Sequence, residues 1–456
     1  MVFMKTILLP IWLGQVTRNF FRTDVYHSLI ERADVRFVVV TQDEKALDYK
    51  REFVHPRLEF IGIKEIGKTR KEAFFSKLAL NLLDVETTAI FQRRLYKTEQ
   101  SLVKYSIRKF ITKCIGNIPY FKRAFRYADY RLNSDDTLKE LFDQASPDLV
   151  YLPNIFGLLD VKFYKEAKKR GVRTVGLVNS WDNTTSRGLM RAAPDSLIAH
   201  NERIKYEASS FHEVPGESIH VVGMPHFDYY LTSRPSPKDT FYARLGITDL
   251  NKRIILFSPL GIKEDDIGER TIKAFIHAVK NKELPDDLIL LVRYSPNQIS
   301  FFKKEFLDEN VVYDLPGFHY EGKTPNDWEF YLDDMQHLYD TLFYSSVLVN
   351  YGSTLSIDIA AFDKPIIVID YDKNAWWRNF NHHTLLRSYD AARYVSDEKE
   401  LKDWINAYLL NSDVDSEGRK RLLNDQCWKF DGKSGQRLGD LIFQILCNGL
   451  GEKSVK

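Results

Sequence analysis

Short apolar runs, rich in β-branched residues, alternate along this chain with stretches in which apolar residues recur at helical spacing. In the first half these runs occupy positions 6–13, 35–41, 58–63, 148–152, 172–178, 196–199 and 219–222. In the second half they occupy positions 253–258, 288–293, 311–313, 347–350 and 366–369. Such alternation is typical of parallel strands that helices cover on both faces. The pattern therefore predicts an α/β protein with two doubly wound, Rossmann-like domains.

The two series of strands are separated by a segment rich in turn formers, Ser233-Arg-Pro-Ser-Pro-Lys238. We therefore expect a first domain over residues 1–228, a linker over 229–251 and a second domain over 252–430. A length of 456 residues is sufficient for two cores of this size. Residues 431–456 predict a further helix, for which Ser434 is a good N-cap.

The most informative chemistry follows the apolar run 347–350. Gly352 permits a tight bend, and Ser353 can cap a helix that starts at Thr354. The N-terminus of a helix attracts phosphate through its free N–H groups and its dipole. Asp358 lies one helical turn beyond Thr354 on the same face, where a carboxylate could bind a ribose diol. The alternative is a structural αβ unit, in which Ser353 only caps the helix and Asp358 is solvated.

This segment, with Lys364-Pro365 after the helix, resembles the donor-binding segment of GT-B-fold glycosyltransferases. It is similar also to CDP-glycerol glycerophosphotransferases and to non-hydrolysing UDP-N-acetylglucosamine 2-epimerases. Those families usually have Glu where this chain has Asp358. The resemblance implies a bacterial surface-polysaccharide enzyme with a nucleotide-donor site in the second domain and an acceptor site in the first. It also implies that the C-terminal helix packs back on the first domain.

Ligands of open α/β sheets bind beyond the carboxyl ends of the strands, which selects a few loops. The loop that starts at Gly14 resembles the first loop of GT-B N-terminal domains, which usually faces the acceptor. We expect Gly14 and Arg18 to bind the acceptor there, and Asp24 is a candidate general base.

The loop 179–188 places Trp, Asp, Asn and Arg directly after a strand. Trp181 could stack on a sugar, and an exposed Trp without such a role would be costly. Asp182 is a second candidate base, needed if the reaction inverts the sugar, and Asn183 and Arg187 are candidate acceptor ligands. The alternative is a turn in which Asp182 and Asn183 only satisfy the local backbone.

Three further residues are candidates for the donor site. Arg293 ends a predicted strand, where a guanidinium could bridge a diphosphate, although a surface ion pair is an equal alternative. Gly261 lies in the loop after the first strand of the second domain. His226, in a loop that resembles the G-x-P-x-x-D linker of these families, could donate to phosphate or simply be solvated.

Residues 64–131 differ from the rest of the chain because they hold sixteen Lys and Arg against six Asp and Glu, whereas the whole chain has a net charge of only +2. Val103, Ile107, Phe110 and Ile111 recur at helical spacing between the basic residues. A basic amphipathic segment suits an anionic membrane surface or an anionic acceptor. Alternatively, its apolar stripe packs on its own domain; RNA binding is the weakest interpretation.

Composition excludes several other classes. The small net charge gives no global field that favours nucleic acid, and three Cys without paired spacing argue against a disulfide framework. No signal peptide, long apolar span, P-loop, dinucleotide fingerprint or metal-ligand spacing is present. We therefore expect a cytoplasmic protein that is either free or peripheral at the inner face of the cell membrane.

Together, these features predict a glycosyltransferase that moves a sugar from a nucleotide-diphosphate sugar to a glycan or lipid-linked acceptor. The nucleotide-sugar is a substrate, and neither a metal nor another cofactor is expected, because an Arg and a helix N-terminus can stabilise the leaving diphosphate. The alternatives are transfer of a polyol phosphate from a CDP-linked donor, an epimerase, and a non-catalytic glycan- or nucleotide-binding module.

Overall fold

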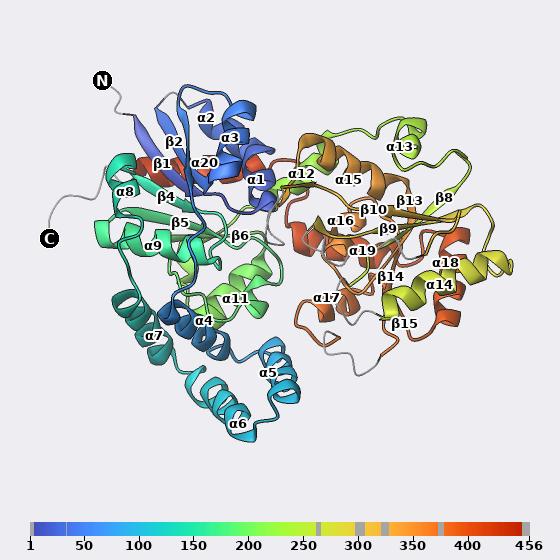
Figure 1. Ribbon diagram of the computed structural model, residues 1–456, viewed down its shortest axis with the longest axis horizontal. Coiled ribbons are helices and arrows are strands. Elements are labelled where there is room, and N and C mark those ends of the chain that lie inside the picture. Colours follow the sequence, from blue (N-terminus) through green and yellow to red (C-terminus); the bar gives the residue numbers. More distant parts are fainter. Residues whose placement is uncertain are drawn as a thin grey trace.

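The computed structural model describes residues 4–32, 34–260, 266–296, 306–320, 328–372 and 378–448. The chain forms two α/β domains that lie side by side, each built around a parallel sheet (Figure 1). This arrangement confirms the predicted fold class. Gly261, one of the expected donor ligands, lies outside the described residues.

The first sheet has seven parallel strands in the order β3-β2-β1-β4-β5-β6-β7. Its strands are β1 (Lys5–Pro10), β2 (Val35–Gln42), β3 (Leu58–Ile63), β4 (Leu149–Leu152), β5 (Arg173–Leu177), β6 (Ser196–Ala199) and β7 (Ile219–Val221). The helices of this domain, apart from the basic segment, are α1 (Gly14–Phe21), α2 (Asp24–Ile30), α3 (Asp43–Glu52), α8 (Lys139–Ala145), α9 (Leu158–Arg170), α10 (Asn183–Ser186) and α11 (Glu202–His212). Because apolar side chains cover both faces of the sheet, its central strands are almost fully buried.

The second sheet has six parallel strands in the order β10-β9-β8-β13-β14-β15. Its strands are β8 (Arg253–Phe257), β9 (Leu288–Arg293), β10 (Val311–Asp314), β13 (Ser345–Asn350), β14 (Ile366–Ile369) and β15 (Arg393–Val395). The helices around it are α14 (Asp266–Lys280), α15 (Leu332–Tyr344), α16 (Leu355–Ala360), α17 (His383–Ser388), α18 (Glu398–Leu410) and α19 (Ser416–Cys427). The sequence pattern missed the edge strand β15, whose three residues are too few to show a period.

Helices α12 (Pro225–Thr232) and α13 (Lys238–Arg244) connect the two domains. The last helix, α20 (Ser434–Cys447), returns to the first domain and packs against α2 (Figure 1). Leu438, Ile442 and Leu446 of α20 belong to the core of the first sheet. The approach to α2 is close, since a Cβ at Gly439 would lie 1.8 Å from the Ser28 Oγ.

A short hairpin of the second domain, β11 (Phe318–His319) with β12 (Trp328–Glu329), reaches the first domain. We call Trp328, Glu329 and Phe330 the interdomain strap. The Nζ of Lys45 donates to the Trp328 carbonyl at 3.0 Å, and the Thr17 hydroxyl donates to the Glu329 carboxylate at 3.1 Å. Sequence reasoning did not predict the hairpin or the strap.

The basic segment forms a helical insertion in the first domain. It consists of α4 (Arg70–Asn81), α5 (Glu86–Glu99), α6 (Leu102–Phe110), a π-helical turn (Ile111–Ile115) and α7 (Pro119–Leu132). In Figure 1 these helices project below the first sheet. A small apolar cluster that includes Phe75, Leu82 and Phe125 joins α4 to α7.

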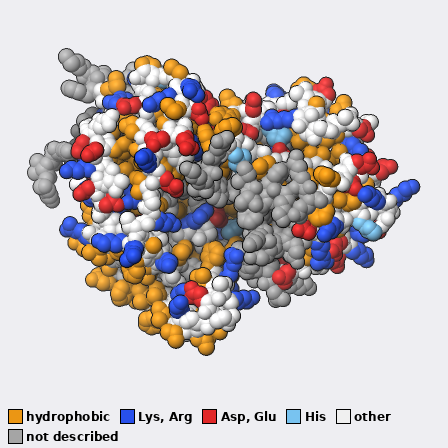
Figure 2. Space-filling model, viewed as in Figure 1, with side chains coloured by type: hydrophobic (Ala, Val, Ile, Leu, Met, Phe, Trp, Pro, Cys, Tyr) orange, Lys and Arg blue, Asp and Glu red, His pale blue; other side chains and the backbone are white. Residues whose placement is uncertain are grey.

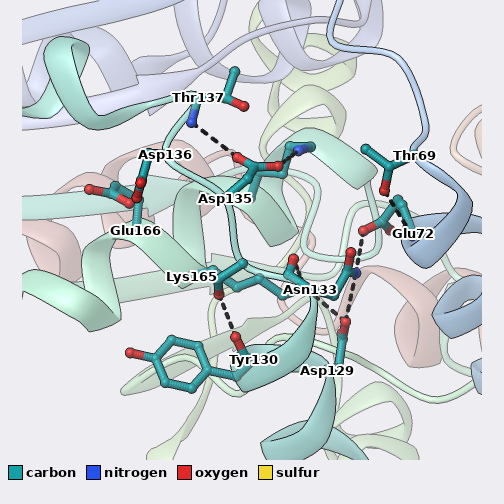
Figure 3. A network of polar contacts seen from close by, with 12 residues as sticks. Thr69, Glu72, Asp129, Tyr130, Asn133, Asp135, Asp136, Thr137, Lys165 and Glu166 are labelled. Atoms are coloured by element: carbon teal, nitrogen blue, oxygen red, sulfur yellow. Dashed lines mark hydrogen bonds and ion pairs between the residues drawn. The ribbon is translucent and has the colours of Figure 1, made fainter.

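Buried charges fix the insertion to the domain (Figure 3). Arg191 pairs with Glu72 of α4 and donates from Nε to Asp129 of α7 at 2.8 Å, while Lys165 of α9 donates to Asp129 at 2.8 Å. Asn133 donates to both carboxylates, at 2.7 and 2.9 Å. Burial opposes ionisation of Glu72 and Asp129, but Arg191 and the other donors hold the pKa of each below its usual value.

The apolar stripe of α6 does not pack on its own domain, since α6 has no buried residue. Val103 is 70% exposed, Ile107 54% and Phe110 60%. Figure 2 shows hydrophobic side chains gathered at this end of the molecule, with Lys and Arg among them. The expected alternative of internal packing is therefore wrong for these three residues. No helix in the described parts of the chain is long and apolar enough to cross a membrane.

The insertion also contacts the second domain. The backbone N–H and the hydroxyl of Thr87, at the start of α5, donate to the Asn381 side-chain oxygen at 3.0 and 2.9 Å. The rings of Phe91 and Phe380 lie beside this contact, with their centroids 5.4 Å apart. One face of α5 is therefore held by the domain opposite to its own.

We expect Arg191→Ala to destabilise the protein by about 3–5 kcal/mol, because it leaves two buried carboxylates without their shared cation. Denaturant unfolding followed by circular dichroism measures this change. Arg93→Ala is the matched control, since its ion pair with Glu86 in the same insertion is about half exposed and should contribute less than about 1 kcal/mol. Equal effects of the two substitutions would contradict the anchoring role of Arg191.

Candidate functional site

A cavity of about 280 Å³ lies between the two domains. On the second-domain side it lies at the carboxyl ends of strands, with Ser258 after β8 and Arg293 at the end of β9. On the first-domain side Asn179 and Ser180 follow β5. It is therefore placed where ligands of parallel α/β sheets bind. The cavity is lined by Gln15, Arg18, Asn19, Asn179, Ser180, Met224, His226, Ser258, Arg293, Tyr294, Ser295, Pro296, Pro316, Trp328, Phe330, Leu338, Ser353, Thr354, Leu355 and Asp358.

The turn after β13 forms one wall. Gly352 has a φ of +86°, which favours glycine, and a Cβ there would lie 3.3 Å from the His383 ring. The Asn350 side chain holds the turn, because its oxygen accepts from the Gly352 N–H at 2.8 Å. Its amide nitrogen reaches the Ser353 hydroxyl at 3.3 Å and the Ser356 hydroxyl at 2.8 Å.

The prediction that Ser353 caps the helix after this turn is wrong. Helix α16 begins at Leu355, its N-cap residue is Thr354, and no side chain caps it. Ser353 is instead oriented by Asn350, and both Ser353 and Thr354 line the cavity. Because α16 has only six residues, its dipole is short.

Asp358 is buried at the cavity wall and already has protein partners. Its Oδ1 accepts a hydrogen bond from the Tyr230 hydroxyl at 2.7 Å and lies 3.6 Å from the His226 Nε2. No described residue donates to its Oδ2 within hydrogen-bond distance. Sequence reasoning missed Tyr230, although the four-residue spacing of His226 and Tyr230 on helix α12 puts both on one face.

His226 is not a solvated loop residue. It is 7% exposed, lies in the first turn of α12 and lines the cavity. Burial, reinforced by the charge of Arg18, lowers the pKa of His226 to about 4 in spite of the nearby Asp358. Its imidazole is therefore neutral near pH 7, and its buried Nδ1 has no partner among the described residues.

Arg293 lines the cavity, but its charge is committed to a buried ion pair. Its Nη1 contacts the Asp314 carboxylate, which also lies 3.1 Å from the His337 Nε2. Although burial opposes ionisation, Arg293 and His337 hold the pKa of Asp314 well below its usual value. Arg293 therefore forms the ion pair that was the alternative to binding a diphosphate, although the pair is buried and not at the surface as expected.

Arg18, on α1 of the first domain, lines the same cavity. Its Nε donates to the Asn19 side chain at 3.0 Å, and its guanidinium lies 5.7 Å from the centre of the Phe330 ring. Burial lowers the pKa of Arg18, whereas Tyr230 and Asp358 raise it. None of the described carboxylates lies within ion-pair distance of Arg18.

The three expected acceptor ligands in the loop after β5 lie differently from the expectation. Trp181 is only 5% exposed and packs with its ring 5.4 Å from that of His382, so its prediction as an exposed sugar platform is wrong. Asn183 is buried at the start of α10, whereas Arg187 is exposed at its end. None of these three residues lines the cavity.

Asp182 lies two residues beyond Ser180, which does line the cavity. One carboxylate oxygen accepts from the Ser180 hydroxyl at 2.6 Å and the other from the Ser186 hydroxyl at 2.7 Å. Burial opposes ionisation, but His382, these two hydroxyls and Arg187 hold the pKa of Asp182 below its usual value. Asp182 is therefore an ionised, oriented carboxylate beside the cavity.

Two other expected residues lie elsewhere. Asp24 is exposed beside a separate cavity of about 380 Å³ that Asp358 does not line, so Asp24 is not a base at the donor site. Gly14 begins α1, and a Cβ there would lie 2.7 Å from the Trp328 carbonyl oxygen. Contact with the interdomain strap therefore accounts for the glycine. The described residues contain no cluster of three or more His, Cys, Asp or Glu that could hold a metal ion.

Solved structures with the same fold cover nearly the whole chain. The Staphylococcus aureus MnaA–UDP structure is 12% identical, with a TM-score of 0.56 and coverage of 97% of each chain. A glycosyltransferase from Rickettsia africae is 11% identical, with a TM-score of 0.52 and coverage of 98% of this chain and 99% of that one. The wall teichoic acid polymerase TagF is 12% identical, with a TM-score of 0.52 and coverage of 98% and 90%. At these identities the likeness shows the fold alone.

A comparison with curated proteins gave no significant match. A family model, described as CDP-glycerol:poly(glycerophosphate) glycerophosphotransferase, matches residues 178–444. The matched region includes the loop after β5, the linker and most of the second domain, which together supply most of the cavity wall. The match confirms the expected transferase class. Since it spans more than half of the chain, this protein belongs to the CDP-glycerol:poly(glycerophosphate) glycerophosphotransferase family.

Proposed function

We propose that this protein transfers a group from a nucleotide-diphosphate-linked donor to a glycan or lipid-linked acceptor, in the cavity between its domains. The observation that carries the proposal is the meeting of an anchored carboxylate, Asp358, with the glycine turn Gly352-Ser353-Thr354 at one interdomain cavity. This combination suits the two polar parts of a nucleotide donor, its ribose and its phosphates.

The donor orientation follows from these contacts. Tyr230 fixes one oxygen of Asp358 and leaves Oδ2 available for a ribose hydroxyl. Ser353 and Thr354, one turn earlier, offer hydroxyl and backbone N–H groups to the phosphates. In this arrangement an arginine at the cavity and the hydrogen-bond donors of the turn stabilise the leaving phosphate. We therefore expect the reaction to need no metal ion.

Two transferred groups are compatible with this donor. In sugar transfer the acceptor oxygen attacks the anomeric carbon, the bond to the diphosphate breaks, and a nucleoside diphosphate leaves. In polyol-phosphate transfer the acceptor oxygen attacks the outer phosphorus, the phosphoanhydride bond breaks, and a nucleoside monophosphate leaves. The match to the glycerophosphotransferase family supports polyol-phosphate transfer as the second candidate function, beside sugar transfer. In both reactions the acceptor hydroxyl loses its proton.

Asp182 is the proposed base for that proton. It is ionised, and hydroxyl groups orient both of its oxygens beside the first-domain wall of the cavity. A carboxylate in this position can take a proton as the acceptor oxygen attacks.

We further propose that the protein works as a peripheral protein at an anionic membrane surface, the inner face of the cell membrane. The support is the exposed apolar stripe of α6, with Val103, Ile107 and Phe110, beside the exposed Lys104 and Lys109. Apolar side chains can enter the interfacial region of a bilayer while lysines attract anionic headgroups. Nucleic acid is not a proposed partner.

Nucleotide binding tests the donor site. We expect one of UDP, CDP, GDP or ADP to raise the Tm of the protein selectively, with EDTA present, because a ligand of the folded state stabilises it by mass action. Asp358→Ala should abolish the shift. If no nucleotide shifts the Tm, the donor site is refuted, and a non-catalytic module becomes the better interpretation.

Product analysis with the selected donor tests the chemistry. Release of nucleoside monophosphate would identify polyol-phosphate transfer, and release of nucleoside diphosphate would identify sugar transfer. Asp182→Asn should lower kcat by about 10²- to 10⁴-fold, as expected for loss of a general base. Its nucleotide-induced shift in Tm should remain as in the unmodified protein. Full activity of this variant would exclude Asp182 as the base.

Vesicle flotation tests the membrane contact. We expect binding to phosphatidylglycerol vesicles but not to phosphatidylcholine vesicles, and weakening with added salt, because lysine charges contribute to the binding. The double substitution Ile107→Asp and Phe110→Asp should lower the bound fraction at least about 10-fold, since it removes two exposed apolar side chains that would enter the bilayer interface. Leu410→Asp, which changes a 90% exposed leucine of the second domain, is the control. Equal flotation of both variants would contradict this surface.

A further inference from the structure

The phosphates of a nucleotide donor need a cation, and the described residues of the second domain offer little positive charge at the cavity. The dipole of α16 is short because the helix has six residues. The guanidinium of Arg293 faces Asp314, whose carboxylate compensates its charge. The neutral imidazole of His226 adds no charge near pH 7. The described residues of the second domain therefore do not supply the positive charge.

Arg18 supplies that charge from the first domain. An arginine stays protonated even when it is buried. Arg18 lines the cavity with Ser353 and Thr354, and its Nε donates a hydrogen bond to a neutral amide, that of Asn19. The Phe330 ring of the interdomain strap lies 5.7 Å away and limits the directions that the guanidinium can take. Arg18 thus combines positive charge, partial burial and a restricted position.

We infer that Arg18, and not Arg293, is the cation that binds the phosphates of the donor. This inference rests on the proposed function and deepens it, because the donor site then includes a residue from the opposite domain. Partial burial makes a guanidinium without an ion-pair partner less favourable, so an incoming phosphate is favoured there. Asp358 lies close enough to raise the pKa of Arg18, but no ion pair joins them. Asp358 therefore stays available for the ribose.

The inference changes the role that the resemblance implied for Arg18, which was binding of the acceptor. Both an acceptor phosphate and a donor phosphate have the chemistry that a guanidinium recognises. Binding measured with nucleotide alone separates them, because no acceptor is then present. Arg293 becomes a structural residue whose removal would leave Asp314 and His337 buried without their cation.

Isothermal titration of the full chain with a nucleoside, its monophosphate and its diphosphate tests the inference, using the base that the thermal-shift panel selects. We expect Arg18→Gln to weaken diphosphate binding by about 10- to 100-fold, the range of charge-assisted hydrogen bonds, and nucleoside binding by less than about threefold. Arg18→Lys should recover part of the loss, because it restores the charge without the bidentate geometry.

Two further variants serve as controls. Arg253→Gln alters an arginine at the opposite end of β8, in a pair with Asp287 that is more than one-third exposed, and should bind all three ligands normally. Arg293→Gln should lower the Tm but keep the preference for diphosphate over nucleoside.

If Arg18→Gln keeps this preference and Arg293→Gln loses it, the inference is overturned while the donor site stands. If the unmodified protein binds no nucleotide, the proposed function fails and the inference fails with it.

Discussion

The structure depends on one buried carboxylate between the domains. Glu329 of the second domain and Lys45 of the first are both fully buried, with Oε2 and Nζ 3.8 Å apart, and Tyr49 and Thr17 donate to the same carboxylate. A buried carboxylate requires partners, and here the three side-chain partners come from the opposite domain, while the Phe330 N–H of its own domain donates to the other oxygen. This requirement fixes the interdomain strap against α1 and α3. The strap in turn supplies Trp328 and Phe330 as one wall of the cavity, beside Arg18.

Much of the fold and part of the site were readable from the sequence, because they depend on local pattern. Parallel strands produce apolar runs, and their carboxyl ends meet at one edge of each sheet. Six expected residues therefore reach one cavity: Arg18, His226, Arg293, Ser353, Thr354 and Asp358. What escaped prediction depends on contacts between distant segments. The pairing of Arg293 with Asp314, the burial of Trp181 against His382 and the strap itself have no periodic signature.

The same fold serves several chemistries, so the site residues have to distinguish among them. Solved structures that share it include an epimerase as well as transferases. In this chain the only predicted base that lies beside the cavity in the described structure is Asp182. With Asp358 proposed for the ribose, Asp182 is the carboxylate that fits removal of one proton from an acceptor hydroxyl. The unusual concentration of basic residues lies in the insertion, away from the interdomain cavity.

The contact of Thr87 with Asn381 gives the insertion a mechanical role. Helix α5 belongs to the first domain but is hydrogen-bonded to the second, so the insertion braces the molecule across the interdomain gap. Any hinge motion that separates the domains must break this contact or carry α5 along with it. If α6 is held at a bilayer, the insertion is fixed to the membrane, and a hinge motion moves the second domain relative to the membrane surface. The lipid surface would then set how far and how often the enzyme opens, as well as where it resides.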